Sequence, residues 1–228
     1  MRGYLLVDKP AGWTSFDVVN KLRRASGVKK VGHAGTLDPF ATGLLILLFG
    51  DYTKKQDSFM KMDKVYSVGA VLGQVSSTGD PEGDIIEQST DRPSLPEVEA
   101  AIQTFLGQIQ QVPPAHSAIK INGQRAYDLA RKGKEVIIEP RAVTINAITN
   151  ISYEYPELRF TTDVSSGTYI RSLVSDIGKK LGVGAYTSQL SRDSIGEYVL
   201  TDAISMDDVP DVDTADFIAA HLKTVEEA

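Results

Sequence analysis

The 228-residue sequence contains no cysteine and no run of apolar residues long enough to cross a membrane. Without cysteine there can be no disulfide bond, no cysteine-zinc site and no thiol catalysis, and this composition suits a reducing compartment. A membrane span needs roughly 20 apolar residues, and the apolar run at the N-terminus is also too short for a signal peptide. The sequence lacks a P-loop and clusters of metal-ligand residue types as well. We therefore expect a soluble, cytoplasmic globular protein.

Acidic residues are also missing from one part of the chain, although the net charge is −6. Residues 197–228 hold nine acidic residues and one basic residue, which leaves residues 1–196 with a net charge of +2. Residues 18–37 contain no acid and five bases: Lys21, Arg23, Arg24, Lys29 and Lys30. Such a patch attracts phosphates, because salt screens charges beyond about 8–10 Å. The alternative, a solvated helix face, is favoured if the patch is considered alone.

Residues 30–43 combine three glycines, one histidine and one carboxylate in a stretch without a helical or strand period. Pro39 fixes its own φ angle and pushes Asp38 toward an extended conformation. Residues 44–49 are apolar and of strand length. The pattern predicts a stiff turn that carries Asp38 just before a buried strand. Taken alone, an ordinary structural turn explains it better, since Asp-Pro begins many turns.

The spacing of apolar residues predicts a coarse order of elements. Strands are expected at residues 4–7, 44–49, 65–72, 136–138, 143–153, 158–164 and 185–195. Helices are expected at residues 15–26, 51–60, 94–106 and 168–181, with a C-terminal surface helix at 216–222. Asn122-Gly123 predicts a tight hairpin turn, and a short helix could follow at 127–132. Strands dominate and no βαβ repeat is visible, so we expect an α+β fold with a mixed, largely antiparallel sheet.

Six stretches, in order along the chain, together resemble the TruB family of tRNA pseudouridine synthases. Residues 32–43 are similar to the catalytic loop of that family, and residues 6–10 to its N-terminal motif. Residues 64–66 and 166–171 resemble two motifs that line the active site, and residues 190–198 resemble the strand that closes it. Residues 113–133 resemble an insert that grips the T arm of tRNA. The resemblance runs from about residue 3 to about residue 200 and implies the pseudouridine synthase fold.

The resemblance also implies roles for individual residues. Asp38 would be the nucleophile, Arg171 its ion-pair partner, and Tyr66 a catalytic residue that lies against the target base. A guanidinium partner would keep the Asp38 carboxyl ionised. The residues that would bind substrate are His33, Tyr169, Leu190, Lys9, Thr36, Lys120 and Arg131.

The implied reaction turns uridine into pseudouridine at position 55 in the T loop of tRNA. It oxidises nothing and releases no group, so it needs no metal, nucleotide or redox cofactor. We expect one catalytic domain over residues 1–228, a tRNA-binding insert at about 108–138, and an acidic C-terminal segment at about 199–228. The family's C-terminal RNA-binding domain of the PUA type is not expected here. The partner would be the T stem-loop of tRNA, and the protein would be a monomer.

Several positions depart from the family pattern. His116 stands where a tyrosine is expected, Ser191 where an arginine is usual, and Ser77 where an acid is expected. A non-catalytic RNA-binding protein with the same surface is the main alternative, although binding alone needs no Asp38 beside phosphates. An aspartate-based phosphatase is disfavoured because Pro39-Phe40 follows Asp38, where a second carboxylate would be needed.

Overall fold

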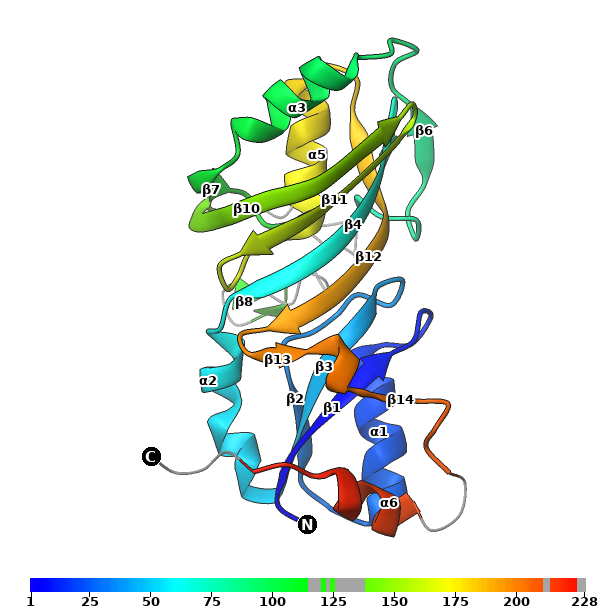
Figure 1. Ribbon diagram of the computed structural model, residues 1–228, viewed down its shortest axis with the longest axis vertical. Coiled ribbons are helices and arrows are strands. Elements are labelled where there is room, and N and C mark those ends of the chain that lie inside the picture. The colour runs from blue at the N-terminus through cyan, green and yellow to red at the C-terminus, as the bar shows by residue number, and fades with distance from the viewer. Residues whose placement is uncertain (115–119, 122–123, 126–137, 211–213, 225–228) are drawn as a thin grey trace. The chain divides into compact units, whose positions relative to one another are not determined.

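A computed structural model describes residues 1–114, 120–121, 124–125, 138–210 and 214–224, with only the main chain described at 120–121 and 124–125 (Figure 1). The contacts divide the chain into two compact units. Unit 1 comprises residues 1–66 and 190–228, and unit 2 comprises residues 67–189. Two strands, β4 and β12, have residues in both units. The expectation of one catalytic domain stays a prediction.

Unit 1 is built on strands in the order β14-β1-β3-β12, with β2 added to β3 and β13 added to β12. The pairs β1–β14 and β3–β12 are parallel, and β1–β3, β2–β3 and β12–β13 are antiparallel. Its strands are β1 (Gly3–Lys9), β2 (Val31–Ala34), β3 (Thr42–Phe49), β13 (Tyr198–Val199), β14 (Ile204–Ser205) and part of β12 (Ala185–Ile195). Its helices are α1 (Ser15–Ser26), η1 (Gly50–Lys55), α2 (Gln56–Met60), η2 (Leu200–Asp202) and α6 (Thr214–His221).

Both faces of the β1–β3 pair are buried, because successive side chains of a strand point to opposite faces. On one face, Leu5 and Val7 pack with α1 and with Ile218 of α6. On the other face, Tyr4 and Leu6 pack against η1 and α2. The apolar run of β3 serves both clusters, so it lacks the alternation of a half-exposed strand.

The start and end of α1 follow the sequence prediction. Thr14 caps the helix, and its side chain forms a capping box with Asp17. Gly27 lies just beyond the end, and its N–H donates to the Arg24 carbonyl. These bonds define where the helix begins and ends.

Unit 2 contains the strand order β12-β4-β11-β10-β7 and a separate β5–β6 hairpin. Helices α3 and α5 contact each other on one face of this sheet (Figure 1). The elements are β4 (Lys64–Leu72), β5 (Gln74–Ser76), β6 (Ile85–Glu87), α3 (Leu95–Gln103), β7 (Gly107–Gln111), β8 (Lys120–Ile121), β9 (Gln124–Arg125), β10 (Arg141–Glu154), β11 (Glu157–Val164) and α5 (Ile170–Lys180).

The predicted α+β class with a mixed, largely antiparallel sheet is confirmed. The strands β8 and β9 pair antiparallel on either side of 122–123, as a two-residue hairpin turn requires. The strand expected at 136–138 and the helix expected at 127–132 lie outside the described residues, apart from Ile138, which is not in a strand.

Several elements differ from the prediction. Residues 31–34, expected to be loop, form β2 because the edge of β3 offers them main-chain partners. Residues 107–111 form β7 against β10, although Gly107-Gln108-Ile109-Gln110-Gln111 shows no apolar alternation. Residues 51–60 are a 3₁₀ turn followed by a short α-helix, and the helix predicted to reach residue 106 ends at Gln103.

The acidic C-terminal segment is more firmly attached than a surface tail. Strand β14 pairs with β1, and Lys223 and Tyr4 exchange two main-chain hydrogen bonds of 2.8 and 2.9 Å. Ile218 of α6 is fully buried. The negative net charge of this segment hid these apolar and main-chain contacts from the sequence analysis.

Candidate active site

Asp38 lies in the loop between β2 and β3, and both of its neighbours in the chain are fixed to other parts of unit 1. The Leu37 N–H donates to Ser15 Oγ (2.9 Å), and Ser15 Oγ donates to the Leu37 carbonyl (3.2 Å). On the other side, the Pro39 carbonyl accepts from the Gly12 N–H (2.8 Å). Asp38 itself is half-buried. Its carboxylate therefore stands on a loop whose main chain is held on both sides.

Lys9 also holds the Asp38 loop, through hydrogen bonds from its side chain. Its side chain is completely buried, and Nζ donates to the carbonyls of Pro10 (2.8 Å), Trp13 (2.7 Å) and Pro39 (3.2 Å). A buried ammonium is costly unless its donors find acceptors. These contacts assign Lys9 to positioning the Asp38 loop, whereas its predicted contact with substrate remains untested.

Arg192 of β12 is a second buried cation that is bonded to this loop. The sequence analysis did not single it out. Its Nε donates to the Leu44 carbonyl (2.8 Å) and its Nη2 to the Gly35 carbonyl (3.1 Å). At Gly43, with φ of +98°, a Cβ atom would lie only 2.5 Å from the Arg192 carbonyl oxygen. Only glycine fits there, so Gly43 and Arg192 together fix the end of the Asp38 loop.

His33 lies on β2, in the strand that leads into the Asp38 loop. Burial lowers the pKa of its imidazole, and the positive charge of Arg192 lowers it further. Its Nδ1 atom is buried and has no well-formed hydrogen bond within the described residues. The ring is therefore neutral at pH 7, which suits contact with an apolar or aromatic group.

Three more predicted substrate contacts lie in unit 1. Thr36 is exposed at the start of the Asp38 loop. Tyr66 of β4 and Leu190 of β12 are 7 % and 8 % exposed. Both are almost completely buried, and their predicted place in the walls of a nucleobase pocket stays a prediction.

Lys64, two residues before Tyr66, is a third buried cation. Its Nζ donates to the carbonyls of Met60 (2.9 Å) and Met62. Burial, together with the charge of Arg192, lowers its pKa to about 8.

We expect the Lys64→Met variant to lose a pH dependence of stability that the wild type has. In the unfolded chain the lysine keeps its proton up to about pH 10.4, whereas in the folded protein it loses the proton near pH 8. Between these values the unfolded state binds more protons, so the wild type gains stability as pH rises. From pH 7 to 10, its free energy of unfolding should rise by about 2–3 kcal/mol relative to the variant.

Urea unfolding of both proteins at pH 7 and pH 10 measures this difference. Comparison with the variant cancels the titration of tyrosines such as Tyr198, whose pKa burial raises to about 12. Parallel changes in the two proteins would show that Lys64 keeps an ordinary pKa.

Arg171, at the start of α5 in unit 2, forms a buried ion pair that the sequence analysis missed. Its Nη1 donates to Asp80 Oδ2 and to the Thr78 carbonyl, both at 2.9 Å. The Arg171 and Asp80 side chains are 5 % and 3 % exposed. Asp80 Oδ1 accepts from Thr78 Oγ1 (2.5 Å) and from the Glu82 N–H (3.0 Å). This network fixes the direction of the guanidinium.

Tyr169 lies directly before α5 and is half-buried. Its main-chain N–H and carbonyl are both hydrogen-bonded to the side chain of Gln111, at 2.8 and 3.1 Å. Neither Gln111 nor Asp80 was predicted from the sequence. Both are polar side chains whose importance depends on contacts with residues far away in the chain.

The remaining predicted residues are only partly placed. Asp38 belongs to unit 1 and Arg171 to unit 2, so the ion pair between them stays a prediction. Lys120 lies in β8, where the main chain alone is described, and Arg131 lies outside the described residues.

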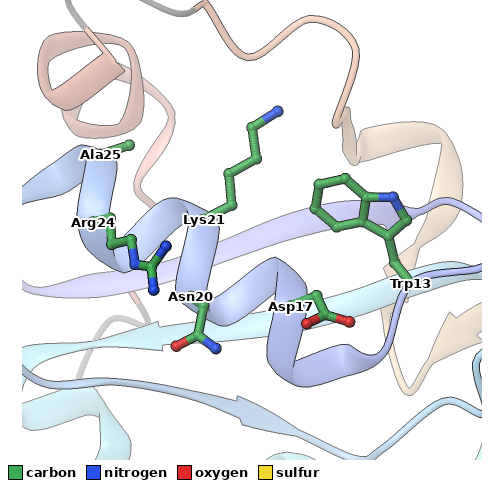
Figure 2. Close-up of a pocket in the computed structure, with 6 residues that line it drawn as sticks. All are labelled: Trp13, Asp17, Asn20, Lys21, Arg24 and Ala25. Carbon is green, nitrogen blue, oxygen red and sulfur yellow. The ribbon is translucent and has the colours of Figure 1, made fainter.

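A hollow of about 690 Å³ lies on the exposed side of α1 (Figure 2). It is lined by Trp13, Asp17, Asn20, Lys21, Arg24 and Ala25. The Lys21 ammonium lies 5.6 Å from the centre of the Trp13 ring, and the Asp17 carboxylate is bound in the capping box with Thr14. Lys21 and Arg24, two of the five bases in residues 18–37, thus line the same hollow as the Trp13 ring.

Within the described residues, no three histidine, aspartate or glutamate side chains gather closely enough to hold a metal ion. None of the described helices has the length and apolarity needed to cross a membrane.

Comparison with solved structures identifies the fold. A chain of a solved Cbf5–Nop10–Gar1 complex superposes with a TM-score of 0.70 at 27% identity, covering 91% of this chain and 53% of that one. A chain in a structure of an H/ACA RNP bound to a substrate RNA superposes with a TM-score of 0.68 at 25% identity, covering 91% of this chain and 52% of that one. The chain thus spans about half the length of these solved chains, and the predicted pseudouridine synthase fold is confirmed.

Sequence comparisons identify the family. Residues 23–170 match the model of the TruB family pseudouridylate synthase N-terminal domain. The chain is 45% identical over 207 residues to a tRNA pseudouridine synthase B of Protochlamydia amoebophila (strain UWE25), covering 90% of this chain and 78% of the relative. It is 43% identical over 221 residues to the protein of that name from Endomicrobium trichonymphae, covering 96% and 95%. The chain therefore belongs to the TruB family of pseudouridylate synthases.

Proposed function

We propose that this protein isomerises uridine to pseudouridine in tRNA, at position 55 of the T loop, with Asp38 as the nucleophile. The observation that carries the proposal is the half-buried Asp38 on a loop fixed by Ser15, Gly12 and Lys9, in a chain of the TruB family. The relatives named tRNA pseudouridine synthase B support tRNA as the substrate.

The reaction breaks the bond between C1′ and N1 of the uridine and forms a bond between C1′ and C5. The proton on C5 is lost and N1 gains one, so the atoms of substrate and product are the same. A carboxylate suits this chemistry, because it can attack either the ribose C1′ or the base C6 and later leave again. Both points of attack are compatible with Asp38.

The other predicted residues would orient the charged nucleophile and enclose the detached base. A guanidinium has five N–H donors, so Arg171 can hold Asp80 and orient Asp38 at the same time. Tyr66, Tyr169 and Leu190 would form the walls within which the uracil rotates. Excluding water there would prevent hydrolysis of the glycosyl intermediate to an abasic site.

The target base must leave the folded T loop to react, which costs a few kcal/mol. A neutral His33 can fill the space that the base vacates, since burial and Arg192 lower its pKa. Lys120 and Arg131 would hold the phosphates of the T arm.

Pseudouridine mapping on an unmodified tRNA transcript tests the proposal. Carbodiimide treatment and primer extension should give a stop at the T-loop uridine after incubation with the wild type. A transcript with cytidine at that position should give none. If the wild type produces no stop but still shifts tRNA in a salt-dependent manner, the protein binds RNA without this activity.

We expect the basic face of α1 to contribute to tRNA binding through Lys21 and Arg24, which line the hollow in Figure 2. The double variant Lys21→Ala/Arg24→Ala should bind tRNA about 3- to 10-fold more weakly at 0.1 M salt. The slope of log K against log [salt] should become shallower by about 1 for each phosphate that the variant no longer neutralises. Filter binding over a range of salt concentrations measures both.

The control removes the same charge from the far end of α5, with Lys179→Ala/Lys180→Ala. Both lysines are exposed, and Lys179 pairs locally with Asp176 (2.9 Å). Equal affinities and slopes for the two double variants would make the α1 face an ordinary solvated surface.

A further inference from the structure

Gln111 is a buried glutamine at the end of β7, and its side chain is bonded to the main chain of a residue 58 positions away. It is 1 % exposed. Its Oε1 accepts from the Tyr169 N–H at 2.8 Å, and its Nε2 donates to the Tyr169 carbonyl at 3.1 Å. Because an N–H can only donate and a carbonyl can only accept, these two bonds fix which end of the Gln111 amide faces which atom.

The bonded residue is the one that begins α5. Tyr169 is the N-cap of this helix, and no side chain caps the helix there. The Tyr169 carbonyl also accepts the first helical bond, from the Leu173 N–H at 3.1 Å. The Gln111 amide bonds both main-chain groups of the N-cap residue, including its N–H, which a capping box would satisfy from N3. It therefore restricts rotation of the peptide groups on both sides of Tyr169.

Two further contacts hold the same region. Ser172 Oγ, in the first turn of α5, donates to the Val112 carbonyl at 2.8 Å. Ser165, at the start of the preceding loop, exchanges hydrogen bonds of 2.8 Å with Thr144 of β10. The loop before α5 is thus tied to β10, and the first turn of α5 is tied to the chain just after β7.

We propose that Gln111 is a positioning residue of the reaction: it sets the main chain at Tyr169 and thereby the directions of the Tyr169 and Arg171 side chains. This inference rests on the function proposed above. Gln111 acts through Tyr169 and does not contact the substrate. A shift of about 1 Å in groups that hold a reacting base can lower a rate by roughly 100-fold, so a two-bond clamp on the main chain can matter for the chemical step.

A role only in folding, or only in holding RNA through the segment after β7, would give different kinetics. A purely structural clamp would lower thermal stability and leave the rate of the folded protein unchanged. A clamp that serves RNA binding would raise KM and leave kcat unchanged. The positioning role lowers kcat and leaves KM unchanged.

The test compares Gln111→Met with Gln110→Met, which makes the same substitution at the exposed neighbouring residue of β7. Methionine keeps the length of glutamine but can neither accept nor donate the two bonds. At a temperature well below unfolding of each protein, Gln111→Met should lower kcat for pseudouridine formation about 10- to 100-fold with KM within about twofold of wild type. Gln110→Met should match the wild type.

Gln111→Glu provides a second readout that survives if the methionine variant fails to fold. An ionised glutamate accepts from the Tyr169 N–H but places a second oxygen against the Tyr169 carbonyl. A protonated glutamate can make both bonds, and burial raises its pKa. The kcat of Gln111→Glu relative to wild type should therefore rise as pH falls from 8 to 6.

The outcomes separate this proposal from the proposed function. If the wild type and Gln110→Met form pseudouridine and Gln111→Met has their kcat, the positioning role is wrong and the function stands. The positioning role is also wrong if Gln111→Met changes only KM. It is wrong as well if the kcat of Gln111→Glu relative to wild type does not change between pH 8 and 6. If the wild type itself forms no pseudouridine, both proposals fall.

Discussion

Asp38→Asn is expected to form no detectable pseudouridine while still binding tRNA. Asparagine has the shape of aspartate but lacks the charge and nucleophilicity of a carboxylate. The rate of pseudouridine formation should fall by roughly 10⁴-fold or more, the scale on which removal of a catalytic group acts. Affinity for tRNA should be equal or slightly higher, because one negative charge near the RNA is removed.

The measurement is release of tritium from tRNA labelled at C5 of uridine, under single-turnover conditions with enzyme in excess. Asp51→Asn is the matched control, because Asp51 is exposed at the start of the 3₁₀ turn η1 and lies outside the proposed site. Asp38→Ala should be measured in parallel, since slow deamidation of asparagine would regenerate aspartate. If Asp38→Ala released tritium at the wild-type rate, another residue would have to be the nucleophile.

Asp38 also illustrates which parts of the candidate site can be predicted from the sequence. Asp38 could be singled out because its surroundings are local: glycines, Pro39 and an apolar strand follow one another within a few residues. The groups that hold its loop in place are not local. Lys9 and Arg192 are basic residues that composition alone would put on the surface, and only the fold shows that main-chain carbonyls of the loop bind both of them.

The elements of the fold also differ in whether their own residues predict them. Elements with a local signal were predicted well, such as α1 with its capping box and the two strands around Asn122-Gly123. Strands β2, β7 and β14 were missed because their own residues do not favour a strand. They form because a neighbouring strand offers unpaired main-chain groups, which is information that lies elsewhere in the chain.

Asp80 is the clearest case of a site residue that the sequence hides, since the sequence pattern showed only a missing acid at Ser77. We expect Asp80→Asn to lower both stability and activity. Its amide can keep the bonds of Oδ1 with Thr78 and Glu82, but it brings either an N–H group or an uncharged oxygen to the Arg171 guanidinium. Because both side chains are buried and their atoms are 2.9 Å apart, the free energy of unfolding should fall by about 3 kcal/mol.

The effect on catalysis should be measurable separately from the effect on folding. Without the Asp80 charge, Arg171 would keep its bond to the Thr78 carbonyl but lose the carboxylate that fixes its direction, and its proposed hold on Asp38 would weaken. We expect kcat to fall at least about 100-fold at a temperature where the variant is still folded, with KM for tRNA little changed. Urea unfolding and single-turnover rates on the same preparation separate the two effects.

Asp84→Asn is the control for this prediction, because Asp84 lies in the same loop, is exposed, and bonds to Ser77 through its main-chain N–H (2.9 Å) and carbonyl (3.0 Å). It should match the wild type in both measurements. If Asp80→Asn lost stability but kept the wild-type kcat, Asp80 would serve only to neutralise a buried guanidinium. If it lost kcat without losing stability, the charge of Asp80 would act on the reaction through the direction of Arg171, and the ion pair would add little to the fold.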